Sequence, residues 1–356
     1  MQQNAVYILA WSIETEKPFT EHTIKLDNGS TVTRHYKNHS IRYWLEYANY
    51  LGKGSPMNVV QTKIGNEGKL DKSFVREKYL GVFKPEITFH SVESNEDSDF
   101  YNGYGNGRDG KLLDSLLSGG AYIKRDETIA EPLFKIREYL RKEQEKGREA
   151  IPYKEYLKKA KELKVHHPKE ILENWLFKTG VVYYRSGKFD NKIILDQGWA
   201  IKAIYTIFDR NRGTPYEIEN SKGIFSGSLL IQVWKGKYPD RKTHLLFVNF
   251  MKSCDLCFEI DIGKRTPILE ERRFMAPQLI TKERPIVIDD FWADKESIFF
   301  RYSDKFIHEG FIQSFIVKTA YLATLRDIWR NGIQIREIDK FAMIEVQGYE
   351  LNIRLS

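Results

Sequence analysis

The chain has 356 residues, of which 41% are hydrophobic, 13% aromatic and 29% charged, with a net charge of +7 at pH 7. This composition is typical of globular domains and allows two or three hydrophobic cores. No run approaches the roughly 18 apolar residues of a membrane-spanning helix, and no signal-peptide pattern opens the chain, so we expect no membrane association. Because only two cysteines occur, we expect a reducing compartment and predict a cytoplasmic location.

The first third of the chain predicts half of a doubly wound α/β sheet. Apolar runs that suit strands buried on both faces lie at 5–11 (AVYILAW), 57–61 (MNVVQ) and 86–90. Helical patterns lie between them, at 41–50 and 72–79. The resulting β-α-β-α-β order is typical of such a sheet. Residues 23–37, with a turn signal at 27–30, indicate a hairpin inserted before the first helix.

A glycine-rich stretch from Gly105 to Lys111 matches both the GxGxxG and the GxxxxGK patterns of phosphate-binding loops. Both mechanisms need a buried strand directly before the glycines, and the second also needs a Ser or Thr that reaches Mg²⁺. Here the preceding residues are acidic and polar, and Leu112 stands where the hydroxyl is needed. We therefore predict a flexible loop.

The middle of the chain begins with its most charged part, residues 141–164, where we place a domain boundary. A connecting helix, a break at Ile151-Pro152 and a second helix are expected there. Residues 175–258 then alternate short helices with short strands, which suggests a winged-helix-like unit. One expected strand spans 192–195, followed by a turn and an apolar helix that begins at Trp199. Four apolar positions of that helix share one face: Ala200, Ala203, Ile204 and Ile207.

The pattern changes at Ile286, after a pair of prolines that suggests a second boundary. Three stretches are strand-like, at 286–292, 297–303 and 342–355, and residues 310–329 are helical. This predicts an α+β unit of about 70 residues, which is marginal as a lone core and would gain from pairing with another surface.

Motifs that carry chemistry are few. Cys254 and Cys257 form a lone CxxC, whereas a structural zinc site needs four ligands. The alternation around them predicts a strand, in which residues three apart face opposite sides. The sequence contains no GxSxG, HExxH or kinase-type motif. We therefore predict neither a metal site nor a catalytic centre.

Several passages resemble the Roc–COR tandem of Roco proteins, the family of the leucine-rich-repeat kinases and of many bacterial proteins. Two passages are similar to the second half of the Roc GTPase domain: 43–65 and 87–95. The passages that are similar to the COR domain are 176–205, 222–234, 272–285 and 329–335. The fold class that the resemblance implies is α/β plus α+β. It would comprise a partial Ras-like doubly wound sheet, a winged-helix-like COR subdomain and a small α+β COR subdomain.

The departures from the family pattern bear on nucleotide binding. The chain begins at what would be the fourth strand of Roc, without the P-loop, the switch segments or the metal-proximal DxxG. The guanine-reading NKxD motif reads Thr62-Lys63-Ile64-Gly65, in which only Lys63 matches. Ser91 lies where the last nucleotide loop would be. Thr62, Lys63 and Ser91 are therefore vestigial cofactor-binding positions, and we expect neither GTP or GDP with Mg²⁺ nor an enzyme in this chain alone.

The resemblance implies three domains and a regulatory role in signalling. Residues 1–140 would be an incomplete Roc domain, 141–285 the N-terminal COR subdomain and 286–356 the C-terminal COR subdomain. In this family COR packs against the GTPase domain and mediates homodimer contacts. The implied partners are a second copy, a Roc domain or its missing half, and leucine-rich repeats in a parent protein.

Candidate contact residues follow from the same resemblance. The dimer interface is predicted at aromatic residues of the C-terminal subdomain: Phe299, Tyr302, Phe311, Phe315 and Trp329. The alternative is that these residues only fill a small core. Ile193 and Trp199 are predicted to lie near the side that faces Roc, and for Trp199 core packing is the alternative.

Two other functions stay open. A winged-helix nucleic-acid-binding protein would present basic and amide groups from the Trp199 helix, where the sequence offers Lys202 and the run 210–212. We do not expect nucleic acid as a partner, because that cluster is small and the net charge is moderate. The other alternative is a GTPase that is active only with the missing P-loop half.

Overall fold

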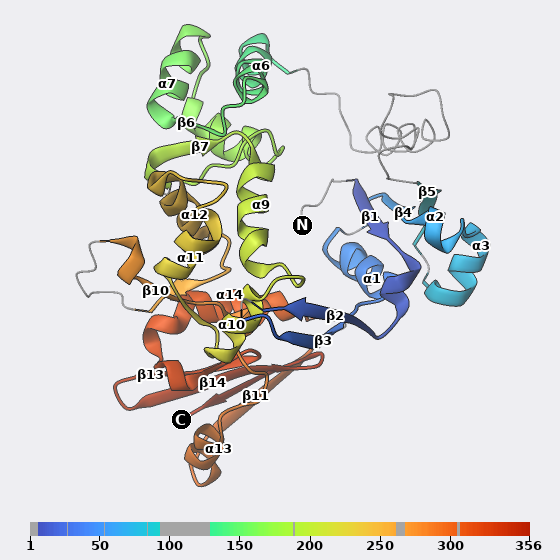
Figure 1. Cartoon of the computed structure of the whole chain (residues 1–356), viewed down its shortest axis with the longest axis vertical. Coiled ribbons are helices and arrows are strands. Elements are labelled where there is room, and N and C mark those ends of the chain that lie inside the picture. Colours follow the sequence, from blue (N-terminus) through green and yellow to red (C-terminus); the bar gives the residue numbers. More distant parts are fainter. Residues whose placement is uncertain are drawn as a thin grey trace. The chain divides into compact units, whose positions relative to one another are not determined.

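The structure is a computed structural model that describes residues 6–26, 28–52, 54–83, 85–92, 129–187, 189–260, 268–304 and 307–356. Two compact units divide the chain: Met1–Ile24 with Gly29–Thr128, and Lys25–Asn28 with Ile129–Ser356. In Figure 1 the first unit is coloured blue to cyan and the second green to red. The predicted loop Gly105–Lys111 lies outside the described residues.

The first unit is built on a parallel sheet of three strands, in the order β1 (Tyr7–Trp11), β4 (Met57–Gln61) and β5 (Ile87–Ser91). Helices lie between the strands in the chain: α1 (Ile41–Gly52), α2 (Ile64–Glu67), α3 (Lys72–Val75) and the π-helical turn Arg76–Leu80. The β-α-β-α-β order is thus confirmed. The predicted hairpin is also present, because β2 (Phe19–Lys25) pairs with β3 (Thr31–Lys37).

The strands of this sheet differ in burial because of their places in it. Every residue of β4 is buried, since β4 lies between two strands. In β1 burial alternates, and Ile8 is 56% exposed. Among the described strands β1 pairs with β4 only, so it is an edge strand. The prediction that residues 5–11 are buried on both faces is therefore wrong, although the strand itself is present.

The second unit begins with a helical layer and a short two-stranded sheet. Its elements are α6 (Glu131–Glu145), β6 (Ala150–Pro152), α7 (Tyr153–Glu162), α8 (Pro168–Glu170), the π-helical turn Ile171–Leu176, β7 (Lys192–Ile194) and α9 (Gln197–Phe208). The expected break is confirmed, because β6 ends at Pro152 and α7 begins directly after it. Ile136 and Leu140 of α6 are buried in the core of this part, so α6 belongs to the second unit.

The apolar helix α9 is the centre of the next core. Asp196 caps it, accepting a hydrogen bond from the Trp199 amide at 3.0 Å, so the helix includes the two residues that were expected to form a turn. The four apolar positions predicted to share one face are all buried: Ala200, Ala203, Ile204 and Ile207. They pack with Trp234 and Phe247, and the indole of Trp234 donates to the Ala203 carbonyl at 2.9 Å.

Three more helices and a small sheet complete this core. They are α10 (Thr214–Asn220), α11 (Gly227–Trp234), α12 (Arg241–Ser253) and the antiparallel strands β8 (Ile224–Ser226), β10 (Arg273–Met275) and β9 (Phe258–Glu259), in that sheet order. Cys254 ends α12, so the strand expected around the CxxC is wrong. Cys257 is fully buried, which raises its thiol pKa to about 12. Among the described residues no His, Cys, Asp and Glu cluster could hold a metal ion.

The C-terminal part is a five-stranded antiparallel sheet with two helices. The sheet order is β11 (Ile298–Ser303), β15 (Glu350–Leu355), β14 (Lys340–Gln347), β13 (Gly332–Glu337) and β12 (Ile328–Trp329). α14 (Glu309–Thr319) packs on one face through Ile312 and Ile316. α13 (Ile286–Ala293) contributes Ile288 and Trp292 to a second small core. Across the described residues no helix is long and apolar enough to cross a membrane.

Two predicted elements of this part are wrong. Residues 286–292 form α13, because Ile288 and Trp292 are buried four residues apart, which is helical spacing. The helix expected at 310–329 ends at Thr319. Thr324 and Asp327 then form a capping box for a 3₁₀ turn, and the chain enters β12 at Ile328.

Candidate functional site

Thr62, Lys63 and Ser91, which were predicted to be vestigial guanine-side positions, lie at the carboxyl ends of β4 and β5, the edge at which parallel α/β sheets bind ligands. Lys63 follows β4 with a left-handed backbone (φ 58°) at the start of α2. Its ammonium group forms an ion pair with Glu14 at 2.6 Å, and this partner lowers the pKa of the Glu14 carboxyl. The one residue that matches the NKxD motif is therefore held within its own unit.

The other two positions are also bonded internally. The Thr62 hydroxyl donates to the Trp11 carbonyl at 3.1 Å. The Ser91 hydroxyl donates to the side-chain carbonyl of Gln61 at 3.3 Å. Gln61 is fully buried, and its amide closes the following loop by donating to the Gly68 carbonyl at 2.8 Å. Gly65, which stands in place of the guanine-reading Asp, has no side chain and so supplies no carboxylate at that position.

An exposed apolar strand is the main surface feature of the C-terminal sheet. All six residues of β11 are exposed, although four of them are large and apolar or aromatic. Their exposed fractions are 63% for Ile298, 50% for Phe299, 52% for Phe300 and 57% for Tyr302. β11 pairs only with β15 among the described strands, so its other edge carries unpaired backbone groups.

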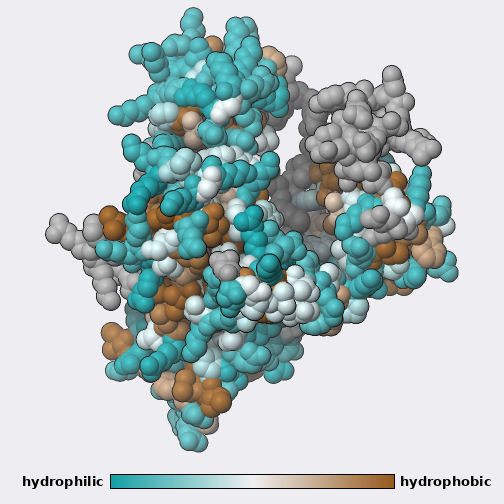
Figure 2. Space-filling model, viewed as in Figure 1, coloured by the Kyte–Doolittle hydropathy of each residue, from teal (hydrophilic) through white to brown (hydrophobic). Residues whose placement is uncertain are grey.

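The register shows which face each side chain occupies. Ile298, Phe300 and Tyr302 stand opposite Leu355, Ile353 and Leu351, and therefore share the face that α14 packs on. α14 lies over β13 and β14, which leaves the β11 end of that face open. Phe299 and Arg301 lie on the opposite face, where the Arg301 guanidinium is 5.4 Å from the Phe299 ring centroid. In Figure 2 hydrophobic patches are visible over the part of the unit that contains this sheet.

The structure distributes the five predicted interface residues differently. Phe299, Tyr302 and Phe311 are at least half exposed, whereas Phe315 is half-buried against the core under α14. Trp329 is fully buried and its indole donates to Glu345 at 3.0 Å, so its side chain offers no surface to a partner. Ile298 was missed, whereas Phe300 was counted among the aromatic residues of this subdomain but was not chosen as a contact residue. In the run IFFRYS large apolar residues occupy both even-numbered and odd-numbered positions, which face opposite sides of a strand. This was the sequence signal for a strand with apolar residues on both faces.

Of the two residues predicted to face a Roc domain, one is fully buried and the other is half-buried. Ile193 is fully buried, so its side chain cannot contact another domain. Trp199 is half-buried, and its ring centroid lies 4.5 Å from the ring centroid of Phe247. The exposed side of α9 instead carries Ile201 and Tyr205, which are 41% and 66% exposed and lie one helical turn apart.

The basic cluster considered for nucleic acid is organised around Asp209. The Arg212 guanidinium lies 3.4 Å from the Asp209 carboxylate, and the Asn211 side-chain amide donates to that carboxylate at 3.2 Å. These contacts hold both side chains near the helix end.

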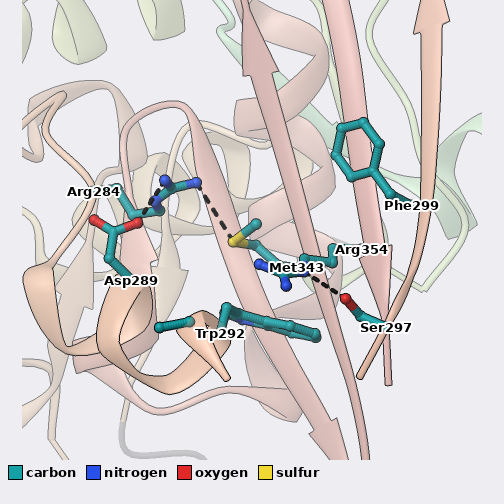
Figure 3. Close-up of a pocket in the computed structure, with 8 residues that line it drawn as sticks. Arg284, Asp289, Trp292, Ser297, Phe299, Met343 and Arg354 are labelled. Carbon is teal, nitrogen blue, oxygen red and sulfur yellow. Dashed lines mark hydrogen bonds and ion pairs between the residues drawn. The ribbon is translucent and has the colours of Figure 1, made fainter. Parts of the chain in front are cut away.

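A cavity of about 390 Å³ lies between α13 and the C-terminal sheet (Figure 3). Arg284 forms ion pairs with Asp289 at 2.5 Å and with buried Glu345 at 2.9 Å. Arg354 donates to the Ser297 hydroxyl at 2.7 Å and stacks on Trp292. Both arginines therefore have partners within the protein. Their contacts with Asp289 and Trp292 of α13 hold this helix against the sheet.

Comparisons with known proteins identify the two parts of the second unit. A family model described as "C-terminal of Roc, COR-A domain" matches residues 131–280, and one described as "C-terminal of Roc, COR-B domain" matches residues 295–356. The chain is also similar to a solved structure of Methanosarcina barkeri Roco2 RocCORdC bound to GDP. That match has 19% identity and a TM-score of 0.42, and it covers 79% of this chain and 97% of that one. No curated protein matches the sequence.

Proposed function

Because the chain belongs to the Roco family, with COR-A and COR-B models that together match more than half of it, we propose that it is a non-catalytic dimerisation and regulatory module. COR domains are the non-catalytic part of Roco GTPases. The proposal assigns homodimer contacts to the C-terminal subdomain and contact with a GTPase domain to the N-terminal one. We propose a cytoplasmic location on the cysteine content alone.

The absence of catalysis is supported by the guanine-side positions. Phosphate binding and hydrolysis depend on a backbone cradle, a lysine and Mg²⁺, and these 356 residues contain no convincing P-loop. The residues that remain of the base-reading side already bond within the unit, through Lys63 to Glu14 and Thr62 to Trp11. A guanine ring would have to displace both contacts and would find no carboxylate at Gly65.

Dimerisation is supported chiefly by the exposure of β11. A fully buried aromatic side chain removes about 150–250 Å² from water, so four half-exposed side chains offer on the order of 400 Å² per copy. A standard interface buries about 800 Å² per partner. β11 therefore supplies about half of a stable interface. Neighbouring exposed residues such as Leu355, opposite Ile298, extend it.

Contact with a GTPase domain is proposed for the outer face of α9. Ile201 and Tyr205 form an exposed apolar pair on the side of α9 opposite its buried face. Ile193 is instead buried in the core that Ile136 and Leu140 of α6 help to form. The winged-helix-like character of this subdomain remains a proposal.

The proposal is tested by measuring the mass and the nucleotide content of the purified protein together. Light scattering after size-exclusion chromatography should give a mass that rises to that of a dimer with concentration. Denatured protein should release no stoichiometric GDP or GTP. A monomer at several hundred micromolar, or one bound nucleotide per chain, would overturn the proposal.

A GTPase that is completed by another segment is the second candidate. The observation that favours it is the outer edge of β1, which could accept a further parallel strand because β1 pairs only with β4 among the described strands. Fluorescent GTP titrated into this chain, alone and with a chain that supplies the P-loop half, separates the two candidates. Nucleotide binding only in the mixture would favour the second.

A further inference from the structure

The unpaired edge of β11 fixes how a second copy of the chain can dock there. We propose that two copies join β11 to β11 in antiparallel orientation, with Phe300 opposite Phe300 of the second copy. The two five-stranded sheets then form one continuous sheet. The inference rests on the proposed dimerisation and adds the contact strand and its register.

The hydrogen bonds at the end of β11 show which backbone groups point outward. Asp304 directly follows β11, and its amide donates to the Tyr349 carbonyl at 3.3 Å, so even-numbered residues direct their backbone groups toward β15. On the other side of β15, Ser356 exchanges hydrogen bonds of 2.9 and 3.0 Å with Phe341 beside β14. Even-numbered residues of β15 therefore bond to β14 and odd-numbered ones to β11, which agrees with the pairing of even-numbered β11 residues with β15. The outward N–H and C=O groups of β11 therefore belong to Phe299, Arg301 and Ser303.

Symmetry then limits the possible registers. A strand that pairs with itself across a two-fold axis is antiparallel. Residues whose backbone groups point outward must pair with residues of the second copy whose backbone groups also point outward. Odd-numbered residues therefore face odd-numbered residues, and the two-fold axis passes between two copies of the same residue. With the axis at Phe300, Ile298 faces Tyr302 and Phe299 faces Arg301 of the second copy. Every apolar residue of the α14 face then meets an apolar residue.

The neighbouring registers are less favourable. An axis at Arg301 places two guanidinium groups directly opposite each other, which destabilises a strand pair. An axis at Phe299 places Tyr302 opposite Glu296 and leaves it without an apolar partner. Only the axis at Phe300 combines the apolar stripe with a contact of Arg301 on an aromatic ring, the type of contact that it already makes with Phe299.

A second copy is the occupant that these features favour. In this register the strand matches itself, because apolar residues face apolar residues on one side of the sheet and Arg301 faces an aromatic ring on the other, whereas a peptide of another sequence would need a separate match on each side. Pairing also removes an exposed apolar edge, which natural sheets otherwise protect with charges or prolines. β11 has neither protection beyond the single charge of Arg301.

Cysteine cross-linking tests the register. In a background in which exposed Cys254 is replaced by Ser, Phe300→Cys should form a disulfide with itself, because non-hydrogen-bonded opposite residues have Cα atoms about 4.5 Å apart. Tyr302→Cys alone should not, since its copies would lie about 14 Å apart. Mixing Ile298→Cys with Tyr302→Cys should restore the cross-link while Phe300 stays in place. Mild oxidation and non-reducing electrophoresis read the result.

A backbone variant gives a second readout. Arg301→Pro removes an outward N–H that the second copy needs, but no hydrogen bond to β15, so it should weaken the dimer about tenfold or more by removing two hydrogen bonds. Arg301→Ala keeps the N–H and is the matched control, and thermal melting of both variants checks that they fold. Sedimentation measures the dimer in each case.

The outcomes separate this register from dimerisation itself. A wild-type dimer in which Phe300→Cys and the mixed pair both fail to cross-link would overturn the β11 register and leave the proposed function standing. A wild type that stays monomeric would overturn both. If the Tyr302→Cys variant cross-links with itself and the Phe300→Cys variant does not, a different register is established and this one is refuted.

Discussion

A single charge on β11 should separate dimer formation from folding. Phe300 is 52% exposed, so a partner that covers it removes about 100 Å² per copy from water. At about 25 cal/mol per Å² the two copies together contribute up to about 5 kcal/mol. Only part of such area appears as affinity, because ordering and desolvation oppose it. Phe300→Asp should therefore raise the dimer dissociation constant by about 100-fold or more, or about 2.7 kcal/mol.

The folded monomer should tolerate this change, because half of the ring already lies in water. A matched control is Tyr321→Asp, which changes a side chain that is 75% exposed in the helical turn Ala320–Leu322. That turn packs on β13, three strands away from β11. A concentration series by sedimentation velocity compares the two variants with wild type. If Tyr321→Asp dissolves the dimer and Phe300→Asp does not, the assignment of the interface to β11 is refuted.

The remaining predictions concern stability and are measured by chemical denaturation. Ile338→Gly should stabilise the protein by about 1 kcal/mol, because Ile338 has φ 54° in an exposed hairpin turn that suits glycine. Gly227→Ala should destabilise it by several kcal/mol, since the added Cβ would lie 1.7 Å from the Leu269 carbonyl oxygen. The hydrogen bond from Arg272 lowers the pKa of the Glu259 carboxyl. The stabilisation of the folded protein by ionised Glu259 is therefore fully present above pH about 4.3 and is lost as the pH falls through the folded-state pKa. Glu259→Gln should reduce that acid dependence, and an unchanged pH profile would contradict this assignment.

Local patterns predicted the buried face of α9 and the β-α-β-α-β sequence of elements in the first unit. In both cases the signal lies in residues that are near one another in the sequence, although the start of α9 was predicted two residues late, because the cap at Asp196 was not recognised. The run 286–292 was ambiguous because apolar residues there fit either period. The run forms a helix because Ile288 and Trp292 are buried together against Trp329 and Met343 of the sheet, which are distant in the sequence. Tertiary packing thus overrode the local pattern.

Contacts between distant residues account for the errors in the candidate sites. Aromatic content alone could not separate buried Trp329 from exposed Phe300, because exposure depends on which strand ends at the sheet edge. The ion pair of Lys63 joins residues 49 positions apart, and no motif indicates Glu14 as its partner. The family resemblance located the positions, and only the fold shows what each side chain contacts.

Sedimentation velocity with fluorescent GDP is the sharpest test of a COR module that dimerises without binding nucleotide, because one run records the protein mass and the bound nucleotide. We expect the protein to sediment increasingly as a dimer as its concentration rises, while the nucleotide stays at the slow rate of a free small molecule. A protein that remains monomeric and carries the nucleotide in its boundary would contradict it.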